Sequence, residues 1–243
     1  FKIREYIDKN RPKSAAIAGG GFIGVELAEN LRGLGMQVAI VQRPGQLLSP
    51  LDPEMAAFVH SALRKRGVNL LLGRSVRGFK ESEKGVAVLL EDEEPLYADM
   101  AVLAIGVTPD SELAREAGLE LGIKGGILVN ERMETSAPDV YAVGDAVQIR
   151  NFVTGEGALI SLAGPANKQA RIAADNICGI PSVYTGTQGS AIVKVFDMTV
   201  ACTGLNEKTA KRLGLAYDKT FTFSPSHASY YPGSTYMTIK TLF

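Results

Sequence analysis

Apolar residues between positions 14 and 42 change from a continuous run to helical spacing and back again. One apolar run at 15–18 leads into a turn, and a second follows at 36–41. Between the two runs, apolar residues fall on one face of a helix: Ile23, Leu27, Leu31 and Leu34. The turn consists of Gly19, Gly20, Gly21, Phe22, Ile23 and Gly24. The order strand, glycine turn, helix, strand predicts the βαβ unit that binds dinucleotides.

Each glycine of this turn has an expected role. Gly19 permits the tight turn, Gly21 lets the backbone approach a pyrophosphate, and Gly24 lets the helix pack close to the strand. The helix N-terminus adds unpaired N–H groups for the phosphates. A glycine turn with a purely structural role is the alternative, and the two flanking strands favour nucleotide binding over it.

The second strand ends with Gln42 and Arg43, where a dinucleotide-binding unit usually has an acidic residue that binds the ribose 2′-hydroxyl. Without that carboxylate nothing repels a 2′-phosphate, and the Arg43 guanidinium can bind one bidentately. The alternative is a solvated polar pair in which Gln42 still bonds the hydroxyl. The sequence leaves both interpretations open.

The following residues predict further helices and strands. A helix is expected after Asp52 as N-cap with Pro53 in its first turn, and strands are expected at 68–72 and 100–104. Alternation at 76–80 and 86–90 predicts a hairpin. A strand that runs into Gly144 would place Asp145 at the carboxyl end of a parallel sheet, where α/β folds bind ligands.

The C-terminal part of the chain has a different organisation. A helix is expected at 162–178, followed by a boundary between Pro181 and Gly189. Residues 190–243 alternate short β-like runs with one helix, for which Asn206 is the expected N-cap. This pattern predicts a separate α+β piece.

Composition excludes several classes of function. Lys+Arg and Asp+Glu both number 26 in 243 residues, so no net charge favours nucleic acid or an anionic membrane. No apolar run approaches the length of a membrane span. Cys178 and Cys202 give neither a disulfide framework nor metal-ligand spacing, which fits a reducing cytoplasm, and both are expected to be buried small residues. With two histidines, no metal site is expected. The chain opens inside a helix-like stretch and stops in a strand-like one, so we expect a piece of a longer protein.

Several motifs together resemble one family. IAGGGFIGVELAENL, AIGVTP and TSAPDVYAVGDAV resemble the FAD-dependent pyridine nucleotide–disulfide oxidoreductases. LAGPANKQARIAADNICG, GSAIVKVFDMTVACTGLNEK and SHASYYPG are similar to the branch of coenzyme A-disulfide reductases, NADH oxidases and persulfide reductases. The resemblance implies an α/β fold: a Rossmann-like NAD(P)H-binding domain (1–118) inserted in an FAD-binding domain whose second segment is 119–182. Residues 183–243 would form part of an α+β interface domain that builds a homodimer.

The resemblance also implies site residues. Gly106 would belong to the second turn that contacts the nicotinamide, and a plain strand-end turn is the alternative. Asp145, after Gly144, would bond the flavin ribitol, or else cap a helix. Leu162 and Ala163 would offer backbone N–H groups to the flavin pyrimidine edge, or simply begin a core helix.

Glu26, expected in the first turn of its helix, would pair with a lysine beside the flavin N5 that is not in this chain. Its alternative explanation is the helix dipole.

Residues His227, Tyr230 and Tyr231 resemble the interface-domain segment that reaches the partner subunit's redox cysteine. A phenol can hydrogen-bond a thiolate there, and His227 can supply a proton near neutral pH. Strand alternation, with one tyrosine packed inward and one facing solvent, is the alternative, and Tyr231 is the expected inward residue.

The expected function is hydride transfer from NAD(P)H to FAD, then electron transfer through a redox cysteine outside this chain to a small-molecule disulfide or persulfide. One alternative is an NADH oxidase or peroxidase that reduces oxygen or peroxide. The other is a nucleotide-binding flavoprotein that serves as a redox switch.

Overall fold

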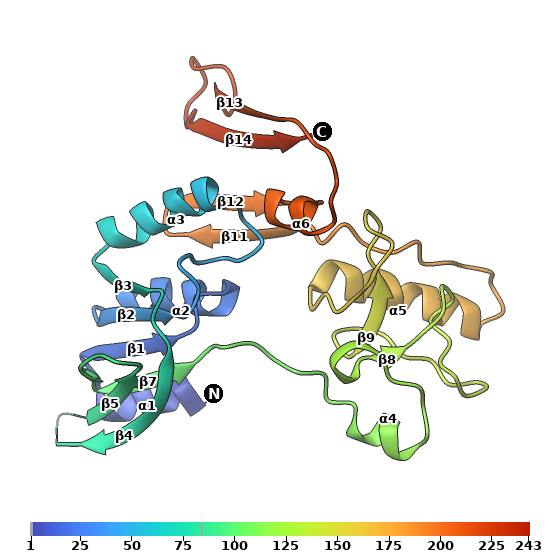
Figure 1. Cartoon of the computed structure of the whole chain (residues 1–243), viewed down its shortest axis with the longest axis horizontal. Coiled ribbons are helices and arrows are strands. Elements are labelled where there is room, and N and C mark those ends of the chain that lie inside the picture. The colour runs from blue at the N-terminus through green and yellow to red at the C-terminus, as the bar shows by residue number, and fades with distance from the viewer. Residues whose placement is uncertain (1, 84) are drawn as a thin grey trace. The chain divides into compact units, whose positions relative to one another are not determined.

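The computed structural model describes residues 2–83 and 85–243, which pack into two compact units (Figure 1). The first unit holds the chain up to Ile105 together with Val193–Val200 and Leu205–Phe243. The second holds Gly106–Ile192 and Ala201–Gly204. These are packing units, and the domain boundaries expected after residues 118 and 182 stay predictions.

A four-stranded parallel sheet forms the centre of the first unit. Its strands lie in the order β3-β2-β1-β7, and all three pairings are parallel. The bounds are β1 Ser14–Ala18, β2 Gln37–Gln42, β3 Val68–Leu72 and β7 Met100–Leu103. β1 and β2 are almost wholly buried, as expected for strands covered on both faces. The Rossmann-like α/β fold predicted from the sequence is confirmed.

Two helices connect the first three strands: α2 (Phe22–Gly33) and α3 (Pro53–Lys65). The expected apolar face of α2 is wrong in detail, because Ile23 and Leu34 are exposed. The residues that α2 buries are Gly24, Val25, Ala28 and Leu31. Of these residues, Gly24 lets the helix approach β1 closely, because a Cβ there would lie 3.6 Å from the Ile17 side chain and 2.0 Å from the Gly19 carbonyl oxygen.

Helix α3 begins after Asp52, as predicted, with Pro53 in its first turn. The Asp52 side chain makes no capping hydrogen bond to α3. Its carboxylate instead accepts hydrogen bonds from the Glu207 N–H and the Lys240 ammonium, two groups far along the chain. These long-range partners compete with the local cap and replace it.

A three-stranded antiparallel sheet packs on the parallel one. It has the order β4-β5-β6, with β4 Val76–Ser82, β5 Gly85–Leu90 and β6 Leu96–Ala98. Its Val88, Leu90 and Ala98 form one buried cluster with Ala16 of β1 and Val41 of β2. The N-terminal helix α1 (Lys2–Asn10) precedes β1.

The C-terminal region contributes a hairpin, a short helix and a two-stranded ribbon. β11 (Ala191–Val195) pairs with β12 (Met198–Cys202), and β13 (Lys219–Pro225) pairs antiparallel with β14 (Tyr236–Leu242). The tip of the first hairpin contacts α2, because the Glu29 carboxylate accepts a hydrogen bond of 2.8 Å from the Phe196 N–H. Helix α6 (Glu207–Arg212) begins after Asn206, whose side chain accepts from the Thr209 N–H, so the predicted cap is confirmed.

The second unit is built around helix α5 (Ala163–Ile177) and a small sheet of order β10-β9-β8. Its core contains Met133, Val147, Ile149, Ala173 and Tyr184. The other elements are α4 Glu112–Glu116, a 3-10 turn at Ile123–Gly125, β8 Ile127–Leu128, β9 Val147–Arg150 and β10 Gly157–Ala158.

The strand predicted to run into Gly144 does not form. Residues 135–142 fold back on themselves: the Thr135 N–H donates to the Val140 carbonyl, and the Ala142 N–H donates to the Met133 carbonyl. Tyr141 makes only an isolated bridge with Glu134. These local hydrogen bonds use the groups that a sheet partner would need.

Candidate functional site

The glycine turn between β1 and α2 is shaped by close backbone approaches. Gly19 has φ of +113°, and a Cβ there would lie 2.2 Å from the Ala104 carbonyl oxygen. A Cβ on Gly24 would lie 2.0 Å from the Gly19 carbonyl oxygen. Both positions therefore require glycine, as the sequence predicts for a tight turn with close helix packing.

Gly21 is different, because a Cβ built on it would meet nothing within 4 Å. Its φ of −77° is open to any residue, so neither strain nor packing requires glycine there. Gly21 is also the N-cap of α2, where it offers no side chain to cover the first-turn N–H groups. The turn thus leaves free space beside a helix N-terminus.

The Gln42 side chain contacts this turn directly. Its Oε1 accepts a hydrogen bond of 2.8 Å from the Gly20 N–H, and its Nε2 donates to the Gln46 carbonyl at 3.4 Å. Arg43 is exposed. Both residues lie at the carboxyl end of β2, beside the glycine turn.

The loop that follows β2 also binds the turn, which sequence reasoning missed. The Leu48 N–H donates to the Gly20 carbonyl at 2.8 Å, and the Leu47 N–H donates to His60 Nε2 at 3.1 Å. His60 therefore presents an unprotonated Nε2, and burial together with the nearby Arg64 lowers its pKa. No pattern in the sequence predicts these contacts, because Leu47 and Leu48 are only two apolar residues in a loop.

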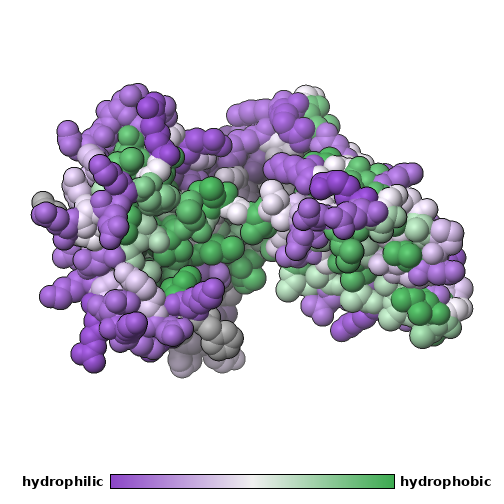
Figure 2. All heavy atoms as spheres, turned by 90° about the horizontal axis from the view of Figure 1, so that it is seen from below, coloured by the Kyte–Doolittle hydropathy of each residue, from purple (hydrophilic) through white to green (hydrophobic). Residues whose placement is uncertain are grey.

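Apolar side chains reach the surface of both units among hydrophilic ones (Figure 2). In the first unit the exposed apolar residues include Ile23 of the glycine turn and Leu103 and Ile105 at the end of β7. The Ala104 N–H donates to the Ala18 carbonyl at 2.7 Å, which extends the pairing of β7 with β1. Phe22 and Ile23 begin α2, so this predicted group of residues lies together with the glycines.

Glu26 is exposed on α2, in its second turn. The expectation that it lies in the first turn is wrong, because the helix begins at Phe22 and its first turn contains no acidic residue. The dipole explanation for Glu26 is correspondingly weaker.

The residues expected at a flavin lie in the second unit. The Gly144 N–H donates to Oε1 of Gln169 at 2.7 Å, and Gln169 is 1% exposed on α5. Gln169 thus fixes the turn that presents the exposed Asp145, and sequence reasoning missed it. The alternative of Asp145 as a helix cap is wrong, because strand β9 follows it.

Leu162 and Ala163 lie at the start of α5, where Leu162 is the N-cap residue. Gly106 has φ of +108° with nothing within 4 Å of an added Cβ. Both observations fit backbone that a ligand can approach.

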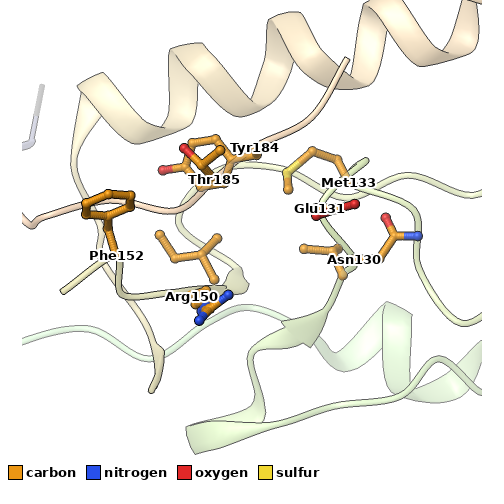
Figure 3. A pocket seen from close by; sticks show the side chains of 9 residues that line it. Asn130, Glu131, Met133, Arg150, Phe152, Tyr184 and Thr185 are labelled. Carbon is orange, nitrogen blue, oxygen red and sulfur yellow. The ribbon is translucent and has the colours of Figure 1, made fainter. Parts of the chain in front are cut away.

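A cavity of about 480 Å³ also lies in the second unit (Figure 3). Its apolar lining includes Met133, Ile149 and Tyr184, and Arg150 and Glu131 are among its polar residues. The Tyr184 hydroxyl is buried without a hydrogen-bond partner among the described residues. None of the residues predicted from the sequence lines this cavity.

The predicted aromatic cluster lies in the loop between β13 and β14. The ring centroids of Tyr230 and Tyr231 are 4.9 Å apart, and those of His227 and Tyr231 are 6.4 Å apart. Tyr230 is 82% exposed and Tyr231 60% exposed, so neither packs inward. The alternative based on strand alternation is wrong because the two residues lie in a turn. Ser226 Oγ is 3.1 Å from His227 Nδ1.

The two cysteines differ from expectation. Cys178 is exposed at the C-terminal end of α5 and is therefore not a buried small residue. Cys202 is half-buried, and burial raises the pKa of its thiol. Residues 2–83 and 85–243 contain no metal-binding group of three or more His, Cys, Asp or Glu, and none of their helices is long and apolar enough to cross a membrane.

The sequence profile of the pyridine nucleotide-disulphide oxidoreductase family matches residues 3–170. The chain belongs to this family. It is 37% identical to an NADH oxidase of Methanocaldococcus jannaschii, over 99% of this chain and 54% of that protein.

Two solved structures show the same fold over almost the whole chain. The reduced CoADR-RHD of Bacillus anthracis has a TM-score of 0.95 and 46% identity, covering 100% of this chain and 43% of that one. An NAD-dependent persulfide reductase from A. fulgidus has a TM-score of 0.94 and 38% identity, covering 99% and 45%. The chain spans about half the length of the curated relatives it matches.

Proposed function

We propose that this chain supplies the NAD(P)H site and part of the FAD site of a flavoprotein that reduces a small-molecule disulfide or persulfide. The main support is the difference between Gly21 and the other two fingerprint glycines, Gly19 and Gly24. Backbone atoms fill the space beside Gly19 and Gly24, whereas the space beside Gly21 is open. A structural turn has no need of a glycine at an open, unstrained position, and a pyrophosphate that lies against the backbone does need one.

The residues of this chain bind and orient in this proposal. The first-turn N–H groups of α2 would receive the pyrophosphate, and Gln42 with Arg43 would face the adenosine ribose. Asp145, held through Gly144 and Gln169, would accept hydrogen bonds from flavin ribitol hydroxyls, and the first residues of α5 would face the pyrimidine edge. Glu26 would lie beside the flavin, and Gly106 would lie beside the nicotinamide.

When bound, the cofactors supply hydride transfer from the nicotinamide to the flavin and electron transfer onward to a thiol. A persulfide or disulfide acceptor is supported by the A. fulgidus persulfide reductase, which is similar over 99% of this chain. An NADH oxidase activity on oxygen is the second candidate, and the M. jannaschii relative supports it. We propose a homodimer that works in a reducing cytoplasm.

Cofactor choice gives a test of the ribose end of the site. Because no acid stands at position 42, the chain is expected to bind NADPH at least as well as NADH, and Arg43→Met to weaken NADPH alone. Gln42→Glu is expected to shift the ratio of the two dissociation constants toward NADH by about tenfold, because a carboxylate repels the 2′-phosphate. Fluorescence titration with both nucleotides measures this ratio.

A hundredfold preference of the wild type for NADH, about 2.7 kcal/mol, would contradict the interpretation of Gln42 and Arg43. It would leave nucleotide binding itself intact. Failure of the chain to bind either nucleotide would refute the proposed function.

The loop between β13 and β14 gives a test of the thiol half-reaction. In the full-length protein, Tyr231→Phe and His227→Ala are each expected to slow disulfide or persulfide reduction about tenfold, the scale for losing one positioned proton donor. Flavin reduction by NAD(P)H, followed by stopped-flow absorbance, should stay nearly unchanged. Thr222→Ala in the neighbouring strand β13 is the control. Wild-type thiol turnover in both variants would show that the loop has no part in the reaction.

A further inference from the structure

Helix α6 binds three consecutive backbone carbonyls in the loop between β2 and α3. The Lys208 ammonium donates hydrogen bonds of 2.8 Å to the carbonyls of both Ser49 and Leu51. The Asn206 Nδ2 donates one of 2.9 Å to the carbonyl of Pro50, which lies between them. These residues are more than 150 positions apart in the sequence and lie in the same compact unit.

The bound loop is the one that contacts the glycine turn. Three residues before Leu51, the Leu48 N–H donates to the Gly20 carbonyl at 2.8 Å. Inside the loop, Gln46 Nε2 donates to the Leu51 carbonyl at 2.9 Å. A short path of hydrogen bonds therefore runs from Lys208 through the loop backbone to Gly20, beside the open position of Gly21.

Helix α6 is itself fixed against the start of α3. The Glu207 N–H donates to both oxygens of the Asp52 carboxylate, at 3.0 and 3.1 Å. The Lys240 ammonium bonds Asp52 and Glu207 together from β14. Because α6 is held in this way, its Asn206 and Lys208 donors have defined positions relative to the loop.

We propose that Asn206 and Lys208 are positioning residues of the pyridine nucleotide site. They order the loop that carries Arg43 and supports Gln42, and so they reduce the conformational entropy lost when a dinucleotide binds. Nothing lies within 4 Å of a Cβ on Gly21, and both side chains donate to backbone carbonyls of the loop. Because the two residues act through this loop, the expected effect is on affinity and is the same for NADH and NADPH. The inference rests on the proposed function.

Two variants remove the donors while keeping the helix. Lys208→Met keeps the aliphatic stem of an exposed side chain and removes the ammonium. Asn206→Asp keeps an equally good N-cap acceptor for the Thr209 N–H and removes the donor to Pro50. Lys211→Met is the matched control, because this substitution also removes one positive charge from α6. Lys211 pairs with Glu207 and not with the loop.

The 243-residue chain is titrated with NADH and with NADPH, and amide exchange at Leu48 and Leu51 is followed in parallel. We expect Lys208→Met to raise both dissociation constants about tenfold, the scale of hydrogen bonds from a charged donor. Exchange at both amides should accelerate. Asn206→Asp should act in the same direction, Lys208→Arg should restore binding, and Lys211→Met should match the wild type.

The outcomes separate the two proposals. If the wild type binds neither nucleotide, the proposed function fails and the positioning role fails with it. If the wild type binds NADH and Lys208→Met and Asn206→Asp bind it equally well, the positioning role alone is overturned. A larger loss for NADPH than for NADH would also overturn it, because that result would indicate direct contact with the 2′-phosphate.

Discussion

Replacing Lys240 with methionine is expected to lower the free energy of unfolding by about 3–5 kcal/mol, the range for removing one partner of a buried ion pair. The Lys240 side chain is 4% exposed. Its ammonium bonds Asp52 at 2.8 Å and Glu54 at 2.6 Å, and it also bonds Glu207. Urea unfolding of the 243-residue chain measures the loss.

The cost arises from the carboxylates that stay behind. Asp52 is 4% exposed. Without Lys240, the Glu207 N–H is the only donor among the described residues that still bonds the Asp52 carboxylate. Glu207 keeps Lys219 at 2.8 Å and the Tyr217 hydroxyl at 2.6 Å, so Asp52 carries most of the uncompensated charge. Adding Asp52→Asn to Lys240→Met should therefore recover part of the stability.

Lys211→Met is the control for this prediction. Its ammonium is 3.5 Å from Glu207 with a side chain 67% exposed, and such surface pairs contribute little to stability because water screens them. If Lys240→Met were no more destabilising than Lys211→Met, the cluster would have no structural role.

The pH dependence of the stability follows from the directions in which the pKa values of Glu207 and Lys240 are shifted. Hydrogen bonds from Lys219, Lys240 and Tyr217 hold the pKa of Glu207 well below its usual value of 4.5. The stability from Glu207 is therefore complete above about pH 4.5 and is lost as the pH falls through the lowered pKa. Burial acts to lower the pKa of Lys240, but hydrogen bonds to Asp52, Glu207 and Glu54 outweigh it and raise that pKa above 10.5. The stability from Lys240 is lost only as the pH rises through this raised value.

The βαβ unit could be predicted from the sequence because its determinants are local. Three glycines at fixed spacing between two apolar runs specify the turn, and Gly19 and Gly24 have the predicted close approaches. The cap at Asn206 was predictable for the same reason, since its partner is three residues away.

Interactions between distant parts of the chain could not be predicted in this way. The sequence predicts Asp52 as a helix cap, yet its carboxylate accepts a hydrogen bond from Lys240, 188 residues later. No pattern in the sequence connects these two positions, and the pairing exists only because α3, α6 and β14 pack together. The contacts of Lys208 with the loop after β2 are of the same kind.

The buried face of α2 was predicted wrongly for a different reason. Apolar periodicity places Ile23 and Leu34 on the buried face, yet they are 61% and 50% exposed, while α2 buries the small residues Gly24 and Ala28 together with Val25 and Leu31. Hydropathy gives small residues little weight, although they set how closely a helix approaches a sheet.

Gly21→Ala is expected to leave the fold almost unchanged and to weaken NADH binding about tenfold or more. The new methyl group meets no protein atom within 4 Å, and φ at this position is −77°. The only expected cost to folding is the poorer N-cap, about 1 kcal/mol or less. The methyl group would occupy the space in which the pyrophosphate approaches the backbone, so binding is lost for a steric reason.

Two other glycines of the same helix serve as controls with opposite expectations. Gly24→Ala places a methyl group 2.0 Å from the Gly19 carbonyl oxygen, so it should lower stability by about 1–3 kcal/mol and also weaken binding. Gly33→Ala meets nothing within 4 Å at the far end of α2, so it should raise stability by up to about 1 kcal/mol and leave binding unchanged. Thermal unfolding and NADH titration of the three variants test this order. Wild-type affinity for NADH in Gly21→Ala, with Gly24→Ala destabilised as expected, would mean that the turn has the predicted structure but that the pyrophosphate does not lie against Gly21.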